Sequence, residues 1–161
     1  MRLARLGCIA LLSLAACGER PQRIEEAPAS AAPKAAPVVK FAGSVRLEGD
    51  LAGAKAGALF VSARRKGQRL PTLSHRFDMS DPAWAAQDGA RVLTFALTDA
   101  DNMGGFGAPM GNEMEVEARY SPSGFIDPRP GAEEAGVVRG SVPAVPGDAN
   151  LSIRLQPTTS K

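Results

Sequence analysis

The feature that most constrains this chain is a two-residue repeat of apolar and polar side chains in short runs. In the clearest run, residues 113–120, Met114, Val116, Ala118 and Tyr120 alternate with three glutamates and Arg119. Such alternation places successive side chains on opposite faces of an extended strand, with one face buried and the other in water. Further runs of this kind lie at residues 41–47, 59–64, 73–79, 93–97, 137–142 and 151–155. The repeat therefore predicts an all-β domain of seven strands.

Turn-forming residues separate these runs, as expected between short strands. The turns are Glu48-Gly49-Asp50, Lys66-Gly67-Gln68, Asp88-Gly89, Pro122-Ser123-Gly124 and Pro146-Gly147-Asp148. Seven short strands of this spacing predict a single antiparallel β-sandwich, immunoglobulin-like in broad architecture. An open barrel is the alternative. One helical turn is expected at residues 80–87, where Ser80 would be the N-cap and Pro82 would lie in the first turn.

The N-terminus carries a separate signal. Arg2 and Arg5 precede a short apolar run that ends at Leu14, about half the roughly 20 residues needed to cross a bilayer. The next residues complete Leu14-Ala15-Ala16-Cys17, which resembles the lipobox of bacterial lipoprotein precursors at all four positions. In that family the cysteine is diacylated, the chain is cut before it, and the new amino group is acylated. The resemblance implies a lipidated Cys17 that anchors the protein to a bilayer. The alternative is an ordinary signal peptide that ends in Ala-Ala-Cys.

The chain thus divides into four expected parts. Residues 1–16 are the lipoprotein signal peptide, 17–40 the lipidated cysteine and a flexible linker, 41–157 the β-sandwich, and 158–161 a tail. The linker contains four prolines and many alanines without hydrophobic periodicity, which is typical of an extended tether. Gly18 stands where an aspartate would favour inner-membrane retention in precursors of this type. We therefore expect a protein of the bacterial envelope that faces the periplasm, with the outer membrane favoured over the inner membrane.

Charge and cysteine content narrow the function classes. The sequence has 19 basic and 17 acidic residues. Removal of Arg2 and Arg5 with the signal peptide would leave 17 basic and 17 acidic residues. This balance argues against nucleic-acid binding, which needs a basic surface. The cysteines are Cys8 and Cys17, so the predicted domain has no thiol nucleophile, redox motif or cysteine-based zinc site. A single histidine and the absence of a Gly-x-Ser-x-Gly motif indicate a protein that is not an enzyme and has no cofactor.

Residues 41–156 resemble the C-terminal periplasmic domain of the cytochrome c-type biogenesis H/I protein family, a component of the bacterial haem-lyase complex. The stretches that carry the resemblance are 43–47, 58–64, 69–71, 95–99, 116–124 and 128–131. The strongest is Val-Glu-Ala-Arg-Tyr-Ser-Pro-Ser-Gly at 116–124. The resemblance implies an immunoglobulin-like domain that takes part in handling apocytochrome c. The family's membrane helices and helical repeats have no counterpart here, and a lipid anchor and tether stand in their place.

His75 is in phase with Leu73 and Phe77 on the apolar face of the third predicted strand. A lone histidine there is expected to be a partly buried structural residue. Trp84, the only tryptophan, is expected to fill the core rather than to anchor a partner.

The Gly-rich segment 99–114 contains three methionines, of which Met114 belongs to a predicted strand core. A contact surface for a protein partner is predicted at this segment and the neighbouring basic turn. Its residues are Met103, Phe106, Met110, Arg64 and Arg65. Because thioethers are soft ligands, the alternative is a copper site formed by Met103, Met110 and His75.

These features predict a membrane-anchored envelope lipoprotein with a non-catalytic β-sandwich that binds a protein partner. The expected partners are the lipid bilayer, through acylated Cys17, and an envelope protein such as a haem-lyase or cytochrome c assembly component. A role as accessory factor in cytochrome c maturation follows from the family resemblance alone. The alternative function is a periplasmic soft-metal protein that binds copper through its Met-rich segment.

Overall fold

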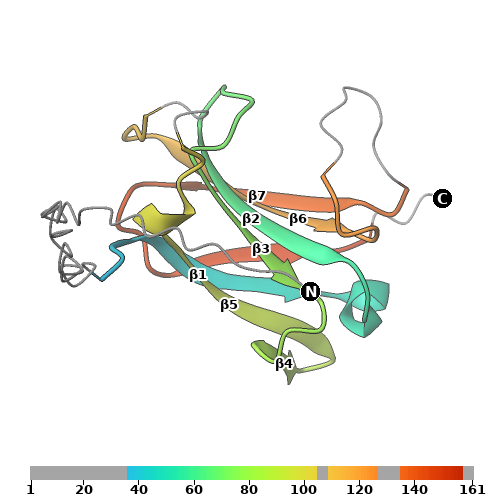
Figure 1. The fold of residues 1–161 in the computed structure, drawn as a ribbon. Helices are drawn as coiled ribbons and strands as arrows, with labels where there is room; N and C mark the ends of the chain where they lie inside the picture. Colours follow the sequence, from blue (N-terminus) through green and yellow to red (C-terminus); the bar gives the residue numbers. More distant parts are fainter. Residues whose placement is uncertain (1–35, 105–108, 127–134, 158–161) are drawn as a thin grey trace, which may run out of the picture. The chain divides into compact units, whose positions relative to one another are not determined.

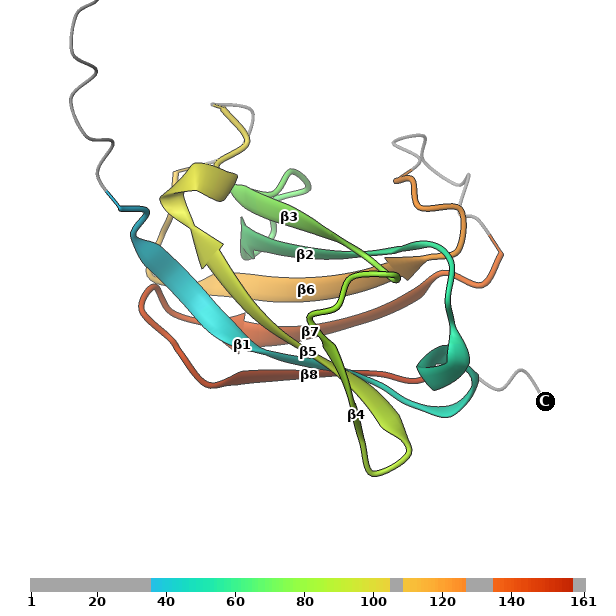
Figure 2. The same cartoon turned by 60° about the horizontal axis from the view of Figure 1, so that its bottom comes forward.

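The computed structural model describes residues 36–104, 109–126 and 135–157, which form two four-stranded β-sheets packed face to face (Figures 1 and 2). Sheet A has the order β4 (Trp84–Gln87), β5 (Ala90–Thr98), β1 (Val39–Leu47), β8 (Leu151–Leu155). Sheet B has the order β3 (Leu73–Asp78), β2 (Ala58–Arg65), β6 (Met114–Ser121), β7 (Val138–Ala144). Between strands lie two 3-10 turns, η1 (Gly49–Gly53) and η2 (Asp99–Asp101). No helix in this part of the chain is long and apolar enough to cross a membrane.

The prediction of an all-β sandwich is confirmed, but its strand count and its pairing are each wrong at one point. The described residues form eight strands rather than seven, and β1 and β8 pair in parallel whereas all other neighbours are antiparallel. The parallel pair follows from the route of the chain. β7 ends at the end of the sandwich where β1 begins, and the turn after β7 crosses to sheet A. β8 therefore enters sheet A from that end and runs in the same direction as β1, with Leu151 beside Gly43 (Figure 2).

The eighth strand lies where one helical turn was predicted, at residues 80–87. Residues Trp84–Gln87 form β4, and Gln87 pairs with Ala90 of β5. Asp88 and Gly89 between them have φ values of 49° and 71°. Two successive residues with positive φ are typical of the two-residue turn that joins a twisted hairpin. β4 was missed because four residues are too few to show a two-residue repeat.

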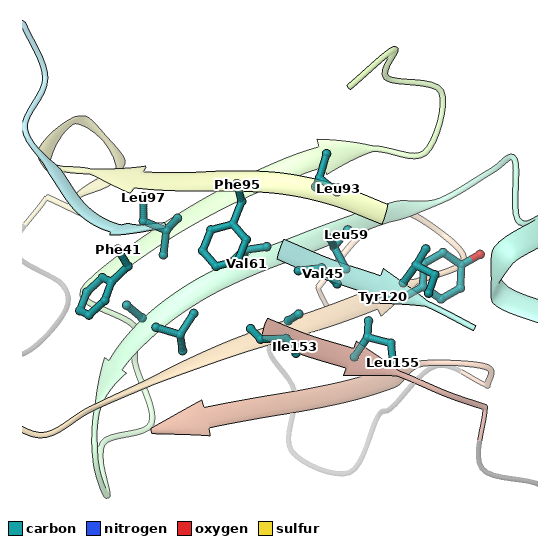
Figure 3. Close-up of a cluster of buried hydrophobic side chains, with 14 of the residues drawn as sticks. Phe41, Val45, Leu59, Val61, Leu93, Phe95, Leu97, Tyr120, Ile153 and Leu155 are labelled. Atoms are coloured by element: carbon teal, nitrogen blue, oxygen red, sulfur yellow. The ribbon is translucent and has the colours of Figure 1, made fainter. Parts of the chain in front are cut away.

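The core is built from the residues that the repeat assigned to the inner faces. Figure 3 shows Phe41 and Val45 of β1 among buried side chains from β2, β5, β6 and β8. The apolar members of the run 114–120 are all buried, whereas Glu115, Glu117 and Arg119 on the opposite face are partly exposed. Burial of this apolar surface, at about 25 cal/mol per Å², is the main source of stability in a domain without cysteines.

The predicted turns are confirmed as well. Each of the five contains a glycine with positive φ: Gly49, Gly67, Gly89, Gly124 and Gly147. The first strand begins at Val39, two residues before the start predicted at 41.

Candidate partner-binding surface

Three connecting segments and the start of β1 gather at one end of the sandwich, here called the proximal end (Figure 2). The backbone N–H of Asp99 donates to the carbonyl oxygen of Val38 at 3.1 Å, which joins η2 to the start of β1. The N–H of Gly147 donates to Lys40 at 2.8 Å, which joins the turn after β7 to the same strand. The N–H of Met103 donates to Thr72 at 3.1 Å, next to the β2–β3 loop.

Most large apolar side chains that remain exposed lie at this end. Of the seven exposed ones among the described residues, five are proximal: Val38, Val39, Leu70, Met103 and Val145. Their exposed fractions run from 43% for Met103 to 58% for Leu70. Phe125 and Ile126 lie at the opposite, distal end, after β6. A local excess of exposed apolar area marks a contact surface more often than scattered single residues do.

The structure separates the methionines predicted from the sequence. Met103 is exposed after η2, whereas Met110 is half-buried and packs against the core. Met114 is buried to 3% exposure, which confirms its place in a strand core. Phe106 lies outside the described residues. Met103 is therefore the methionine of this segment that is most accessible to a partner.

The two predicted arginines end β2 at the proximal end and differ in environment. Arg64 donates from Nε to Glu115 at 3.0 Å and lies 2.8 Å from the carboxylate of Glu117. The hydroxyl of Ser141 donates to Glu115, and this bond together with Arg64 lowers the pKa of the Glu115 carboxyl. Arg65 is exposed and lies beside Gly111. A Cβ atom at position 111 would be 3.0 Å from the Arg65 Nε atom. Arg65 is thus the accessible cation of the pair, and Arg64 is held within sheet B.

His75 was predicted to be partly buried. The structure shows it exposed instead, with 45% of its side-chain surface accessible to solvent. Its predicted face is correct, because its cross-strand partner on β2 is the buried Val61. It is exposed since β3 is an edge strand. Its Nδ1 lies 2.7 Å from the Oδ1 atom of Asp101, and its ring is 4.5 Å from that of Phe77.

Asp101 joins this histidine to η2. Its Oδ2 atom accepts the backbone N–H of Thr98 at 2.7 Å and the Thr98 hydroxyl at 3.0 Å, as in a capping box. Burial by itself would raise the pKa of Asp101, but the bonds from Thr98 and His75 outweigh it, and the pKa is lowered. No sequence pattern indicated this pairing, since residues 75 and 101 belong to different predicted elements.

A soft-metal site would draw on the same rim of the sandwich. Because Asp101 occupies Nδ1 of His75, Nε2 is the nitrogen available to a ligand. Met103 follows η2 closely and is bonded to Thr72, directly before β3, while its neighbour Asn102 pairs with Leu73 of β3. Met103 and His75 therefore lie along one edge. Met110 packs on the core instead. Within the described ranges, no group of three or more His, Cys, Asp or Glu side chains is arranged to hold a metal ion.

Two hollows lie at opposite ends of the described sandwich. One, of about 580 Å³, opens at the proximal end and is lined by Lys66, Asn112, Glu113, Pro143 and Val145, among others. Its exposed apolar wall extends the proximal surface.

The other hollow, of about 600 Å³, lies beside Trp84 and residues 52–55. Trp84 is half-buried, in part the core filler that was predicted. Its Nε1 donates to Asp78 at 3.0 Å, and the guanidinium of Arg91 lies 4.9 Å from its ring centre.

Comparison with known proteins identifies no family. No protein-family model matches the chain, and no curated protein matches it in sequence. Among solved structures, a fimbrial assembly protein from Parabacteroides distasonis is similar at 12% identity and a TM-score of 0.42. The match covers 73% of this chain and 53% of that protein, so this chain spans about half its length. A likeness of this size carries no functional argument.

Proposed function

We propose that this chain is an envelope lipoprotein, anchored through acylated Cys17, whose non-catalytic sandwich binds a protein partner at its proximal end. The observation that carries the proposal is the gathering of Val38, Val39, Leu70, Met103 and Val145 at one end. The proposed anchor and the proposed binding surface are connected at this end, because the chain enters the sandwich there from the segment that the sequence predicts as a tether.

The finer proposals rest on the sequence resemblances. The lipobox Leu14-Ala15-Ala16-Cys17 supports anchoring, and Gly18 supports the outer membrane. The stretches at 43–47, 58–64 and 116–124 support an immunoglobulin-like domain and an accessory role in cytochrome c maturation, with a haem-lyase or cytochrome c assembly component as the partner.

A photo-crosslinking amino acid tests the surface in cells. It would be placed at Leu70 or Val145, both exposed at the proximal end, and at Thr94, which is exposed on the outer face of sheet A. We expect one protein adduct from the proximal positions and not from Thr94, with the adduct identified by mass spectrometry. Equal adducts from all three positions would contradict the proposal. An adduct that contains no haem-lyase or cytochrome component would remove the maturation role but leave the binding surface.

The anchor is tested separately by metabolic labelling with a fatty acid. We expect label in the wild-type chain and none in Cys17→Ser, which should also leave the membrane fraction. A Cys8→Ser chain is the matched control, because Cys8 lies within the predicted signal peptide and should keep the label. Label that survives Cys17→Ser would refute anchoring at this residue.

A copper protein is the second candidate, favoured by the shared rim of His75 and Met103. Titration with Cu(I) under reducing conditions tests it. Binding tighter than micromolar that weakens in Met103→Leu but not in Phe125→Leu would support it. A titration without binding in that range would end it.

A further inference from the structure

A row of arginines crosses the outer face of sheet B. Arg76 of β3 pairs across the sheet with Phe60 of β2, Phe60 pairs with Arg119 of β6, and Arg119 pairs with Arg139 of β7. Their sequence neighbours Leu59 and Ala118 are buried, so this row faces outward, away from the core. Figure 1 shows β3, β2, β6 and β7 forming this sheet. At about 4.8 Å per strand, the row is about 14 Å long.

Arg119 is the member of the row whose charge is least well compensated. Its Nε atom is buried and has no hydrogen-bond partner in the described part of the chain. A buried donor without a partner raises the free energy of the folded state. In addition, Arg119 lies directly opposite another cation, Arg139, and like charges in this relation destabilise a sheet.

On β6 and β3, the outward-facing acids nearest to Arg119 and Arg76 are already engaged. Glu117, two residues before Arg119 on β6, lies 2.8 Å from Arg64. Asp78, two residues after Arg76 on β3, binds the Arg76 guanidinium through both carboxylate oxygens, at 2.7 and 3.0 Å. A counter-ion for Arg119 must therefore come from outside the sheet.

We infer that this row docks an acidic, extended segment of a protein partner, with a carboxylate of that segment bound to Arg119. The planar guanidinium suits a carboxylate because two N–H groups can donate side by side. Phe60 offers a half-buried aromatic surface between the cations at Arg76 and Arg119. The inference rests on the proposed function only in making the occupant a protein.

The position of the row favours a protein segment over a lipid surface. Arg119 lies five residues along β6 from Met114, which begins the strand at the proximal end, or about 17 Å away at 3.3 Å per residue. The row also runs across a sheet flank rather than around a loop-rich tip. A surface there can be occupied while the proximal end has its own contact.

The test uses the full chain in a neutral detergent and a hexaglutamate peptide as the probe, with hexaglutamine as the uncharged control. We expect hexaglutamate to bind at low salt and hexaglutamine not to bind. Arg119→Gln should weaken binding about tenfold, the loss expected for one charge-assisted hydrogen-bonded contact. Arg46→Gln is the matched control, because Arg46 lies on sheet A and binds Glu48. It removes the same charge and should leave the affinity within about twofold.

Several results would overturn the inference. They are absence of hexaglutamate binding, equal weakening in both variants, and Arg119-dependent binding of anionic lipid vesicles without binding of the peptide. Should Arg119→Gln fail to fold, the wild-type chain decides the matter through NMR. Peptide-induced amide shifts at Phe60, Arg76 and Arg119 would support the row, and shifts confined to sheet A or the proximal loops would refute it. Failure here leaves the crosslinking at Leu70 and Val145 unaffected, so the two proposals fail separately.

Discussion

Replacing Gly43 by alanine tests the parallel pairing of β1 and β8, the least expected feature of the fold. A Cβ atom at Gly43 would lie 2.2 Å from the carbonyl oxygen of Leu151 and 2.8 Å from its carbonyl carbon. Carbon and oxygen atoms in close contact lie about 3.3 Å apart, so the two backbones would have to separate by about 1 Å. Within sheet A, β8 is bonded to β1 alone. Such a shift therefore disturbs its whole attachment to that sheet.

The expected loss is large because β8 also fills the core. Ile153 and Leu155 are 1% and 0% exposed and face the partner sheet. Overpacking of a core site costs about 1–3 kcal/mol, and more when backbone must move. We expect Gly43→Ala to lower the free energy of unfolding by at least about 3 kcal/mol. At about 4 °C per kcal/mol for a domain of this size, the melting temperature should fall by about 12 °C or more.

The assay is thermal unfolding followed by circular dichroism, with Gly53→Ala as the control. A Cβ at Gly53 would meet no atom within 4 Å, so alanine there should leave stability unchanged or raise it by up to about 1 kcal/mol. A Gly43→Ala protein that melts within about 2 °C of the wild type would refute the pairing. An equal loss in both variants would show that alanine itself, and not the contact with β8, is responsible.

Four further substitutions test the local structure by denaturant unfolding. Asp101→Ala should lose about 1–2 kcal/mol at pH 7, since it removes a cap. Because the pKa of Asp101 is lowered from its usual value of 3.8, this contribution is fully present above that value and is lost as pH falls through the lowered pKa, so the variant and the wild type should converge in acid. Met114→Ala should cost about 2–5 kcal/mol and Met103→Ala less than about 0.5, and equal effects would contradict their burial. Trp84→Phe should cost about 1 kcal/mol through loss of the bond to Asp78, and an unchanged stability would exclude that bond.

The sandwich was predictable because burial in a β-sheet leaves a direct trace in the sequence. Every apolar member of the run from Met114 to Tyr120 is buried, as the two-residue repeat requires. Turn positions were predictable for a similar reason, since a positive φ selects glycine, as at Gly124 and Gly147. These signals are local, and each is readable without knowledge of the partner strand.

What the sequence missed depends on contacts between distant segments. The direction in which β8 joins β1 is set by a crossover between sheets, and no residue within Leu151–Leu155 specifies it. The bond between His75 and Asp101 joins positions 26 residues apart, and the row from Arg76 to Arg119 exists only once β2 lies between β3 and β6. The phase of His75 was predicted correctly, but its exposure was not, because exposure depends on whether another strand covers β3.

The treatment of the sheet edges explains why the candidate surfaces are loops and an outer face rather than a free strand. Directly before β3, the carbonyl oxygen of Thr72 accepts from Met103. At its other end, the carbonyl oxygen of Asp78 accepts from Asp81 and Trp84, so both ends of the edge are occupied. β4 has only four residues. β7 carries Pro143, and it lies so close to β8 that a Cβ at Gly140 would be 2.8 Å from the oxygen of Arg154.

Edges protected in these ways disfavour the addition of a strand from another chain. A protein partner of the kind proposed would therefore recognise side chains. The described residues offer two concentrations of suitable ones, the apolar set around Leu70 and Val145 and the arginine row around Arg119. Because one is apolar and the other cationic, added salt should weaken contacts at the row much more than contacts at the proximal end. The salt dependence of partner binding thus separates the two surfaces without any substitution.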